Sequence, residues 1–491
     1  MTLIADGHPF HYEMENLCRL FFPYESIRTV AQAPDGADGV AAYTGMRRDG
    51  DALTLTARFS AGGRSSEASR TVPAAALERE KECERILAVL LFGLLVRECG
   101  FRPQWGILTG VRPIKLLRRL SEEMGTQRAA ERFRSGFLVS PEKIRLSLST
   151  MENEKRILSL SRPDSYSLYV SIPFCPTRCS YCSFVSQSVG RAEKLVAPYV
   201  ELLCRELSAA ARVAKELSLR LESVYVGGGT PTTLSPEQLS ALLGTIRERF
   251  DLTPCREFTV EAGRPDTVTP ERLAALKRYG VTRISINPQT MNDEVLRRIG
   301  RKHTSAQTLE AFALARRAGF GNINMDLIAG LPGDSLESFR ETVRRVLALG
   351  PESVTVHTLA LKRSSRLNLS GEDFHPDPGA AAGMLDFAGE NLFAAGYRPY
   401  YLYRQSRMVG NLENTGWAKP GYESYYNVYV MDETHTILAC GAGAVTKVRD
   451  PGSDRLKRIF NFKYPYEYIS RHEEMMARKK QVKQEYDQFR K

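Results

Sequence analysis

The sequence predicts an α/β protein built on an incomplete, TIM-like (βα)6 barrel, with a small α+β domain before it and a mixed region after it. From Tyr166 onward there are six short apolar runs, and helical patterns follow the first five, which is typical of a parallel βα array. The 491 residues, 43% hydrophobic and 25% charged, have an ordinary globular composition and suffice for two or three domains.

Residues 1–162 are expected to form the N-terminal α+β domain. Alternating or β-branched stretches separated by D-G and A-G-G turns predict a small antiparallel sheet with strands near 26–30, 40–46 and 53–59. Helical patterns follow at 75–99, 111–124 and 141–159. The apolar run 86–96 lies in the first of them and is too short to span a bilayer, so it predicts a buried core helix.

Residues 163–375 are expected to form the barrel. The six predicted strands are 168–172, 223–226, 258–261, 283–287, 323–328 and 353–358. A helical pattern follows each of the first five, as expected for a parallel βα array. Residues 376–491 form a mixed C-terminal region with aromatic-rich segments, and its basic tail from Arg478 predicts part of a final exposed helix.

The net charge of +11 favours an acidic partner, which could be a nucleic acid, a polycarboxylate or an anionic cofactor, although dispersed charge often only solvates a surface. No RNA-reading motif is present, so nucleic acid is not expected. The N-terminal M-T-L-I-A-D-G-H lacks the basic-then-apolar order of a signal peptide, and we therefore expect a cytoplasmic protein with reduced cysteines.

Three cysteines fall within one short loop after the first predicted barrel strand. The stretch F-C-P-T-R-C-S-Y-C-S-F places them at 175, 179 and 182, where parallel strands end and chemistry is usually sited. Three thiolates can face one inorganic centre, and on a cubane of four irons they leave one iron open for a ligand. A zinc site is less favoured, because no nearby histidine supplies a fourth ligand.

The following strand ends also carry polar or flexible residues. G-G-G-T-P at 227–231 frees backbone N–H groups to approach an anion closely, and Glu261 ends the third strand. The stretch R-I-S-I-N-P-Q follows at 283–289, and Arg301 and Asp326 lie further on. Together these groups predict a binding site for a cofactor at one mouth of the barrel.

The C-x3-C-x2-C spacing, with Tyr181 before the last cysteine, resembles the hallmark of radical S-adenosylmethionine (SAM) enzymes. In that family, three cysteines hold a [4Fe–4S] cluster whose open iron binds the amino and carboxylate groups of SAM. An electron from the cluster then cleaves SAM to methionine and a 5′-deoxyadenosyl radical. The resemblance implies a radical SAM barrel.

Five motifs resemble more closely the oxygen-independent coproporphyrinogen III oxidases, also called coproporphyrinogen dehydrogenases. They are Y-V-S-I-P-F-C, V-G-G-G-T-P-T, V-E-A-G-R-P-D, R-I-S-I-N-P-Q-T-M-N and M-D-L-I-A-G-L-P, within residues 166–365. G-I-L-T-G-V-R-P at 106–113 and A-C-G-A-G-A at 439–444 are similar to the longer HemZ branch. The resemblance implies decarboxylation of two propionates of coproporphyrinogen III to vinyls in haem biosynthesis.

The resemblance also implies the site residues. The metal ligands would be Cys175, Cys179 and Cys182, and the contacts of the cluster-bound SAM would be Tyr169, Gly228 and Glu261. A possible second SAM would contact Tyr181, Gly229, Thr230, Gln289, Arg301, Asp326 and Ala360. No catalytic side chain is assigned, since the cluster and SAM carry the radical chemistry, and a flavodoxin or ferredoxin would supply electrons. His357 and Arg363 are further candidates to face substrate.

Two positions depart from the family pattern. Ser171 replaces the usual histidine of Y-x-H-I-P-F-C, and Phe184 stands where the best-known branch has another cysteine. The absent cysteine is shared with haem-binding chaperones of the superfamily, so a chaperone is the main alternative, followed by radical SAM methyl transfer or haem ring opening. The segment 411–429 either covers a porphyrin-like face or packs the C-terminal region onto the barrel.

Overall fold

The computed structural model describes residues 1–31, 39–75, 80–184, 186–361, 374 and 376–489. The chain forms two compact units, 1–148 with 404–412 and 149–403 with 413–491. The C-terminal region, apart from residues 404–412, thus shares a unit with the barrel. None of the described helices is long and apolar enough to cross a membrane.

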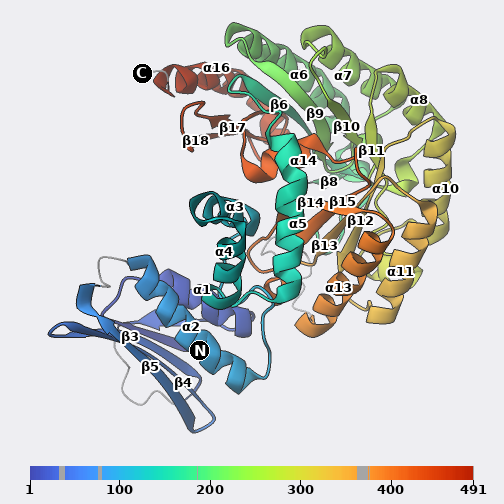
Figure 1. Cartoon of the computed structure of the whole chain (residues 1–491). Coiled ribbons are helices and arrows are strands. Elements are labelled where there is room, and N and C mark those ends of the chain that lie inside the picture. The colour runs from blue at the N-terminus through green and yellow to red at the C-terminus, as the bar shows by residue number, and fades with distance from the viewer. Residues whose placement is uncertain (32–38, 76–79, 185, 362–373, 375, 490–491) are drawn as a thin grey trace. The chain divides into compact units, whose positions relative to one another are not determined.

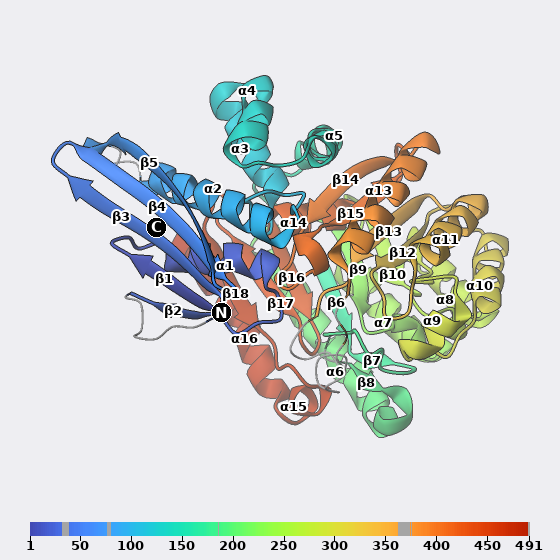
Figure 2. The same cartoon turned by 90° about the horizontal axis from the view of Figure 1, so that it is seen from below.

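The first unit contains a five-stranded sheet in the order β2-β1-β3-β4-β5. Its elements are β1 (Thr2–Asp6), α1 (His11–Phe21), β2 (Arg28–Val30), β3 (Ala41–Asp49), β4 (Ala52–Ala61), β5 (Arg64–Pro73), α2 (Glu80–Cys99), α3 (Pro113–Met124) and α4 (Thr126–Glu131), and α5 (Pro141–Leu158) crosses the division between the units. The run predicted as a core helix lies in α2, whose side chains pack with α1 and one face of the sheet. Figure 2 shows α2 alongside the strands of this sheet.

The prediction of a purely antiparallel sheet was wrong, because β1 pairs in parallel with both β2 and β3. The pairing brings the first residues of the chain beside residues 28–30 and 41–45, a long-range contact that local periodicity does not reveal. The edge strand β5 was also missed, since R-S-S-E-A-S-R-T-V-P is mostly polar and exposed.

The second unit confirms the predicted (βα)6 array. Its parallel strands are β6 (Ser165–Ile172), β9 (Arg220–Gly228), β10 (Glu257–Glu261), β11 (Arg283–Ser285), β12 (Ile323–Ala329) and β13 (Ser353–Thr358), adjacent in that order. Between them lie α6 (Val189–Glu216), α7 (Pro236–Arg249), α8 (Pro270–Arg278), α9 (Asp293–Arg298), α10 (Ser305–Arg317) and α11 (Leu336–Leu349). Most of these helices lie in an arc outside the strands in Figure 1, and α7 and α10 begin with complete capping boxes.

The C-terminal elements extend both edges of this parallel sheet. They are α13 (Pro378–Ala394), β14 (Arg398–Tyr403), β15 (Asn414–Ala418), α14 (Tyr425–Asp432), β16 (Thr436–Cys440), β17 (Val445–Arg449), β18 (Leu456–Phe460), α15 (Pro465–Ser470) and α16 (His472–Phe489). Strand β15 pairs antiparallel with β13, and β16 pairs in parallel with β6. The array has six parallel strands among the described residues rather than the eight of a full TIM barrel, as expected.

The last helix was predicted to be exposed, and this was wrong. Helix α16 buries Met475, Lys479, Val482 and Tyr486 along one stripe. The Nζ of Lys479 lies 2.7 Å from Oε1 of Glu206, a fully buried carboxylate on α6. The same carboxylate accepts hydrogen bonds from Tyr468, Asn461 and the backbone N–H of Gly441.

This buried ion pair yields a stability prediction. Lys479→Met should lower the free energy of unfolding by about 3–5 kcal/mol, because Glu206 would stay buried without its cation. Lys483→Met is the matched control on the same helix. Its 3.2 Å bridge to Glu216 is half exposed, and such pairs contribute roughly 0–1 kcal/mol. Denaturant unfolding followed by circular dichroism measures both, and equal losses would contradict the role of the buried pair.

Candidate functional site

The cysteine loop begins directly after β6 and contains the short paired strands β7 (Phe174–Cys175) and β8 (Gln187–Ser188). Cys179 is buried, and Cys175 and Cys182 are half-buried. Burial, together with the nearby thiols of Cys179 and Cys175, raises the pKa of the Cys182 thiol to about 12. A bound metal centre would supply the positive charge that favours the thiolate form of such a buried thiol.

The glycine stretch at the end of β9 lies directly against this loop. The N–H of Gly229 donates to the carbonyl of Ile172, and the N–H of Thr230 donates to that of Phe174, both at 2.7 Å. A Cβ on Gly229 would lie 2.5 Å from the Phe174 oxygen and 3.0 Å from Sγ of Cys175. No side chain fits there, which explains why this position of the predicted site is a glycine.

Its neighbours add two further constraints. Gly228 has φ +106°, which side chains rarely adopt. The Thr230 hydroxyl lies 3.5 Å from Sγ of Cys175 and donates to it. Thr230 therefore contacts the cysteine loop as Gly229 does, whereas Gly228 pairs with Ile172 at the end of β6, and all three belong to the predicted site.

Glu261 lies at the end of β10 and faces the preceding strand. The hydroxyl of Tyr225 donates to its Oε1 at 2.6 Å, and a Cβ on Gly227 would lie 2.8 Å from the same oxygen. Burial raises the pKa of Glu261 to about 7, against the lowering effect of the Tyr225 hydrogen bond. The carboxyl group can thus gain or lose its proton near neutral pH.

Tyr169 belongs to a stack of three tyrosine rings. Its ring centroid lies 6.3 Å from that of Tyr225 and 6.1 Å from that of Tyr426, and the last two are 4.4 Å apart, with interplanar angles of 25°, 15° and 22°. Tyr426 comes from α14, so part of the segment 411–429 packs onto the barrel strands. Burial raises the pKa of all three phenols, which remain neutral.

Sequence reasoning did not assign Tyr225 to the site, and it included Tyr426 only as part of the segment 411–429. Tyr225 could have been found, because it pairs in register with Tyr169 on the neighbouring strand and lies two residues before Gly227 on the same face of β9. Tyr426 had no local signal, since only the chain's return to the barrel brings it there.

Arg301 connects the fourth strand region to the cysteine loop. Its Nη1 donates to the carbonyl of Asn287 at 2.7 Å and its Nη2 to the hydroxyl of Tyr181 at 3.2 Å. Its Nε is buried and has no hydrogen-bond partner within the described part of the chain. The structure therefore brings together Arg301 and Tyr181, which were both predicted for the site. The Nε–H of Arg301 remains available to a ligand.

Gln289 and Asp326 also lie together. Gln289 has φ +67°, its N–H donates to the carbonyl of Asp326 at 2.9 Å, and its buried Oε1 has no partner among the described residues. Asp326 accepts from Asn324 at 2.7 Å, and its Oδ2 lies 3.7 Å from Nε2 of His357. Burial alone would raise the pKa of Asp326, but hydrogen bonding and charge from His357 lower it.

Ala360 lies half-buried two residues beyond β13, and Arg363 falls outside the described residues. Ser171 is buried, and its hydroxyl donates to the carbonyl of Ala442 at 2.8 Å. A Cβ on Gly441 would lie 3.2 Å from that of Ser171, so the loop 441–444 occupies the space beside this position. Phe184 is 64% exposed.

The residues present fit a multi-iron cluster with a polar ligand. Within the described residues, no three His, Cys, Asp or Glu side chains meet as ligands of a single metal ion. A cubane does not require this, because each thiolate binds a different iron. The glycine cradle, three thiols and the unpartnered polar atoms of Gln289 and Arg301 suit a cluster and a charged cofactor.

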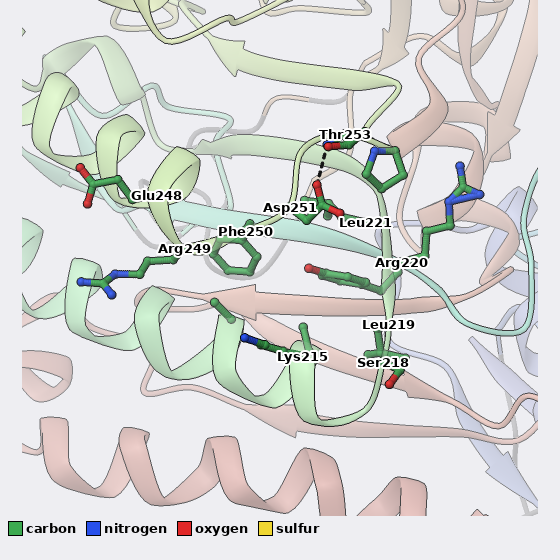
Figure 3. A pocket seen from close by; sticks show the side chains of 14 residues that line it. Lys215, Ser218, Leu219, Arg220, Leu221, Glu248, Arg249, Phe250, Asp251 and Thr253 are labelled. Atoms are coloured by element: carbon green, nitrogen blue, oxygen red, sulfur yellow. Dashed lines mark hydrogen bonds between the residues drawn. The ribbon is translucent and has the colours of Figure 1, made fainter.

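A pocket of about 960 Å³ lies elsewhere and is not this site. Figure 3 shows its lining, which includes Arg220 and Leu221 at the start of β9, Lys215 at the end of α6 and Phe250 after α7. The cysteine loop follows the opposite ends of the same parallel strands. Chemistry in such arrays occurs at the carboxyl ends, where the predicted residues gather.

The tight contact at Gly229 gives the site's first prediction. Gly229→Ala should displace the cysteine loop and strongly reduce the iron and sulfide bound after anaerobic reconstitution. Gly190→Ala is the control, because nothing lies within 4 Å of a Cβ there, and it should retain wild-type iron content. Full iron loading of Gly229→Ala, with unchanged circular dichroism, would contradict the steric argument.

Comparison with known proteins agrees with this geometry. Residues 169–346 match the family model described as the radical SAM superfamily. The chain is 35% identical over 470 residues to the oxygen-independent coproporphyrinogen-III oxidase-like protein HemZ of Bacillus subtilis (strain 168), covering 94% of this chain and 93% of that protein. It is 31% identical to the heme chaperone HemW of Lactococcus lactis subsp. lactis (strain IL1403), covering 66% and 81%.

The fold is similar to that of the coproporphyrinogen III oxidase HemN from Escherichia coli, a radical SAM enzyme, with a TM-score of 0.51, 24% identity and coverage of 65% and 72%. The radical SAM family carries a [4Fe–4S] cluster and SAM, the cofactors that the cysteine motif predicted. From its sequence, fold and cysteine loop, the chain belongs to the HemN-like, HemZ-containing group of the radical SAM superfamily.

Proposed function

We propose that the protein is a radical SAM oxidoreductase that converts two propionates of coproporphyrinogen III to vinyls and so forms protoporphyrinogen IX. The observation that carries the proposal is the 35% identity, over 94% of the chain, to a protein named oxygen-independent coproporphyrinogen-III oxidase-like. The proposal places the protein in porphyrin and haem biosynthesis, in the cytoplasm, with a flavodoxin or ferredoxin as reductant.

The cofactor sites in this proposal follow the strand ends. Cys175, Cys179 and Cys182 would hold the cluster, while Tyr169, Gly228 and Glu261 would contact SAM at its open iron. A second SAM would lie near Tyr181, Gly229, Thr230, Gln289, Arg301, Asp326 and Ala360. When bound, the cluster and SAM supply the means to remove a hydrogen atom from unactivated carbon.

The substrate chemistry has a simple balance. Each –CH2–CH2–COO⁻ group loses a hydrogen atom from its β-carbon, then CO2 and one electron, which leaves –CH=CH2. The electron requires a one-electron acceptor that the proposal leaves to a separate redox partner or centre. The chain's own residues would bind the tetracarboxylate, hold it against SAM and exclude water.

One feature of the barrel suits this substrate. The stacked rings of Tyr169, Tyr225 and Tyr426 provide flat apolar surface beside Glu261.

A haem chaperone is the second candidate, because several relatives carry that name, including HemW of Lactococcus lactis. Ser171 lacks the imidazole of the oxidase motif, and its hydroxyl is engaged by Ala442. In this reading the same cofactor site would support haem binding without turnover of a porphyrinogen.

A product assay tests both candidates. Reconstituted protein, incubated anaerobically with coproporphyrinogen III, SAM and a reductant, should lose two CO2 in sequence and form 5′-deoxyadenosine, read by chromatography and mass spectrometry. A Cys179→Ala variant should do neither. Deoxyadenosine without decarboxylation would favour another radical reaction, whereas haem binding without turnover would favour the chaperone.

The raised pKa of Glu261, about 7, predicts a pH-dependent affinity for SAM. The ionised carboxylate accepts hydrogen bonds, so affinity should fall as the pH drops below 7, with roughly ten-fold weaker binding at pH 6 than at pH 8. Glu261→Gln should weaken binding at pH 8 by roughly 10- to 100-fold, the value of a hydrogen bond to a charged group.

Equilibrium dialysis of radiolabelled SAM against cluster-loaded protein measures this dependence. The amino group of SAM titrates in the same way for both proteins, so the difference between their pH profiles isolates Glu261. Tyr225→Phe removes a hydrogen bond that lowers the pKa of Glu261, and its profile should move to higher pH. Identical profiles for all three proteins would exclude Glu261 from SAM binding.

A further inference from the structure

Arg264, in the loop after β10, contacts the cysteine loop but belongs to neither predicted set of cofactor contacts. It is 3% exposed, and its Nη1 lies 3.9 Å from Sγ of Cys179, to which it donates. Nη1 also donates to the carbonyl of Thr177 at 3.3 Å, and Nη2 donates to the Thr177 hydroxyl at 3.1 Å. The guanidinium therefore binds both the loop backbone and a proposed ligand sulfur.

The other side of this guanidinium faces a carboxylate. Its Nε lies 3.2 Å from Oδ1 of Asp266 and its Nη2 lies 3.3 Å from Oδ2, a two-pronged ion pair. Asp266 lies on the far side of the cation from the thiol, and Nδ1 of the buried His303 is 3.8 Å from it. The positive guanidinium of Arg264 therefore lies nearer to Cys179 than the negative carboxylate of Asp266 does.

We propose that Arg264 is a positioning residue that raises the reduction potential of the cluster, and that Asp266 moderates its effect. The inference rests on the proposal that Cys179 binds the cluster. Reduction adds one negative charge to the cluster and its thiolates, and a nearby buried cation that donates to a ligand sulfur stabilises that charge. Asp266 offsets part of the positive charge, so the two residues act in opposite directions.

A redox titration of the reconstituted protein, followed by electron paramagnetic resonance without SAM or substrate, tests this. Arg264→Gln should shift the midpoint potential to more negative values, and Asp266→Asn should shift it to more positive values. Arg264→Lys keeps the charge and should shift it less than Arg264→Gln. The control is Arg272→Gln, which removes a half-buried arginine that donates to the carbonyls of Leu234 and Thr267, and its potential should match the wild type.

Opposite shifts support the proposal, because general loosening of the loop would not reverse sign between the two residues. Equal potentials in all variants, or shifts of the same sign, would overturn it. If Arg264→Gln binds no iron, the sign of the Asp266→Asn shift decides. Unchanged iron content in Cys179→Ala would show that Cys179 is not a cluster ligand and would refute the proposal about Arg264. A failure to decarboxylate coproporphyrinogen would affect only the proposed function, since the titration contains no substrate.

Discussion

The candidate site depends on the close contact between two backbones, that of the glycine stretch at the end of β9 and that of the loop after β6. The hydrogen bonds from Gly229 and Thr230 to Ile172 and Phe174, both 2.7 Å long, leave no room for a side chain. Because these bonds fix where the cysteine loop leaves the sheet, they also fix where Cys175 lies relative to the strand ends. The position of the cysteine loop relative to the other predicted site residues therefore depends on this contact.

A second constraint is the buried carboxylate of Glu206, which holds Gly441, Asn461, Tyr468 and Lys479 around one point. Burying this pair costs desolvation, so its main effect is geometric rather than a large net stabilisation. The Glu206 carboxylate fixes the loop 441–444 against β6. There, the carbonyl of Ala442 accepts a hydrogen bond from the hydroxyl of Ser171. The C-terminal region therefore shapes the first barrel strand beside the cysteine loop.

Local patterns predicted the six barrel strands and the cysteine loop, because strand periodicity and motif spacing are properties of adjacent residues. Contacts between distant segments were not predictable in this way: β1 pairs with β3, and Tyr426 stacks on Tyr225. The buried stripe of α16 shows an intermediate case. Residues 475, 479, 482 and 486 have helical spacing. Because Lys479 is one of them, the pattern was interpreted as a solvated helix face.

The substitution at Ser171 has a narrower chemical meaning than its place in the motif suggests. In the proposed reaction each propionate loses a hydrogen atom, CO2 and one electron, and no proton appears in that balance. An imidazole at position 171 is therefore not required by the stoichiometry of decarboxylation, although it could order a substrate group by hydrogen bonding. Ser171 instead donates to Ala442 within the protein. The hydroxyl of Ser171 is thus used within the protein, and under the proposed function other groups would hold the substrate, such as the tyrosine stack beside Glu261.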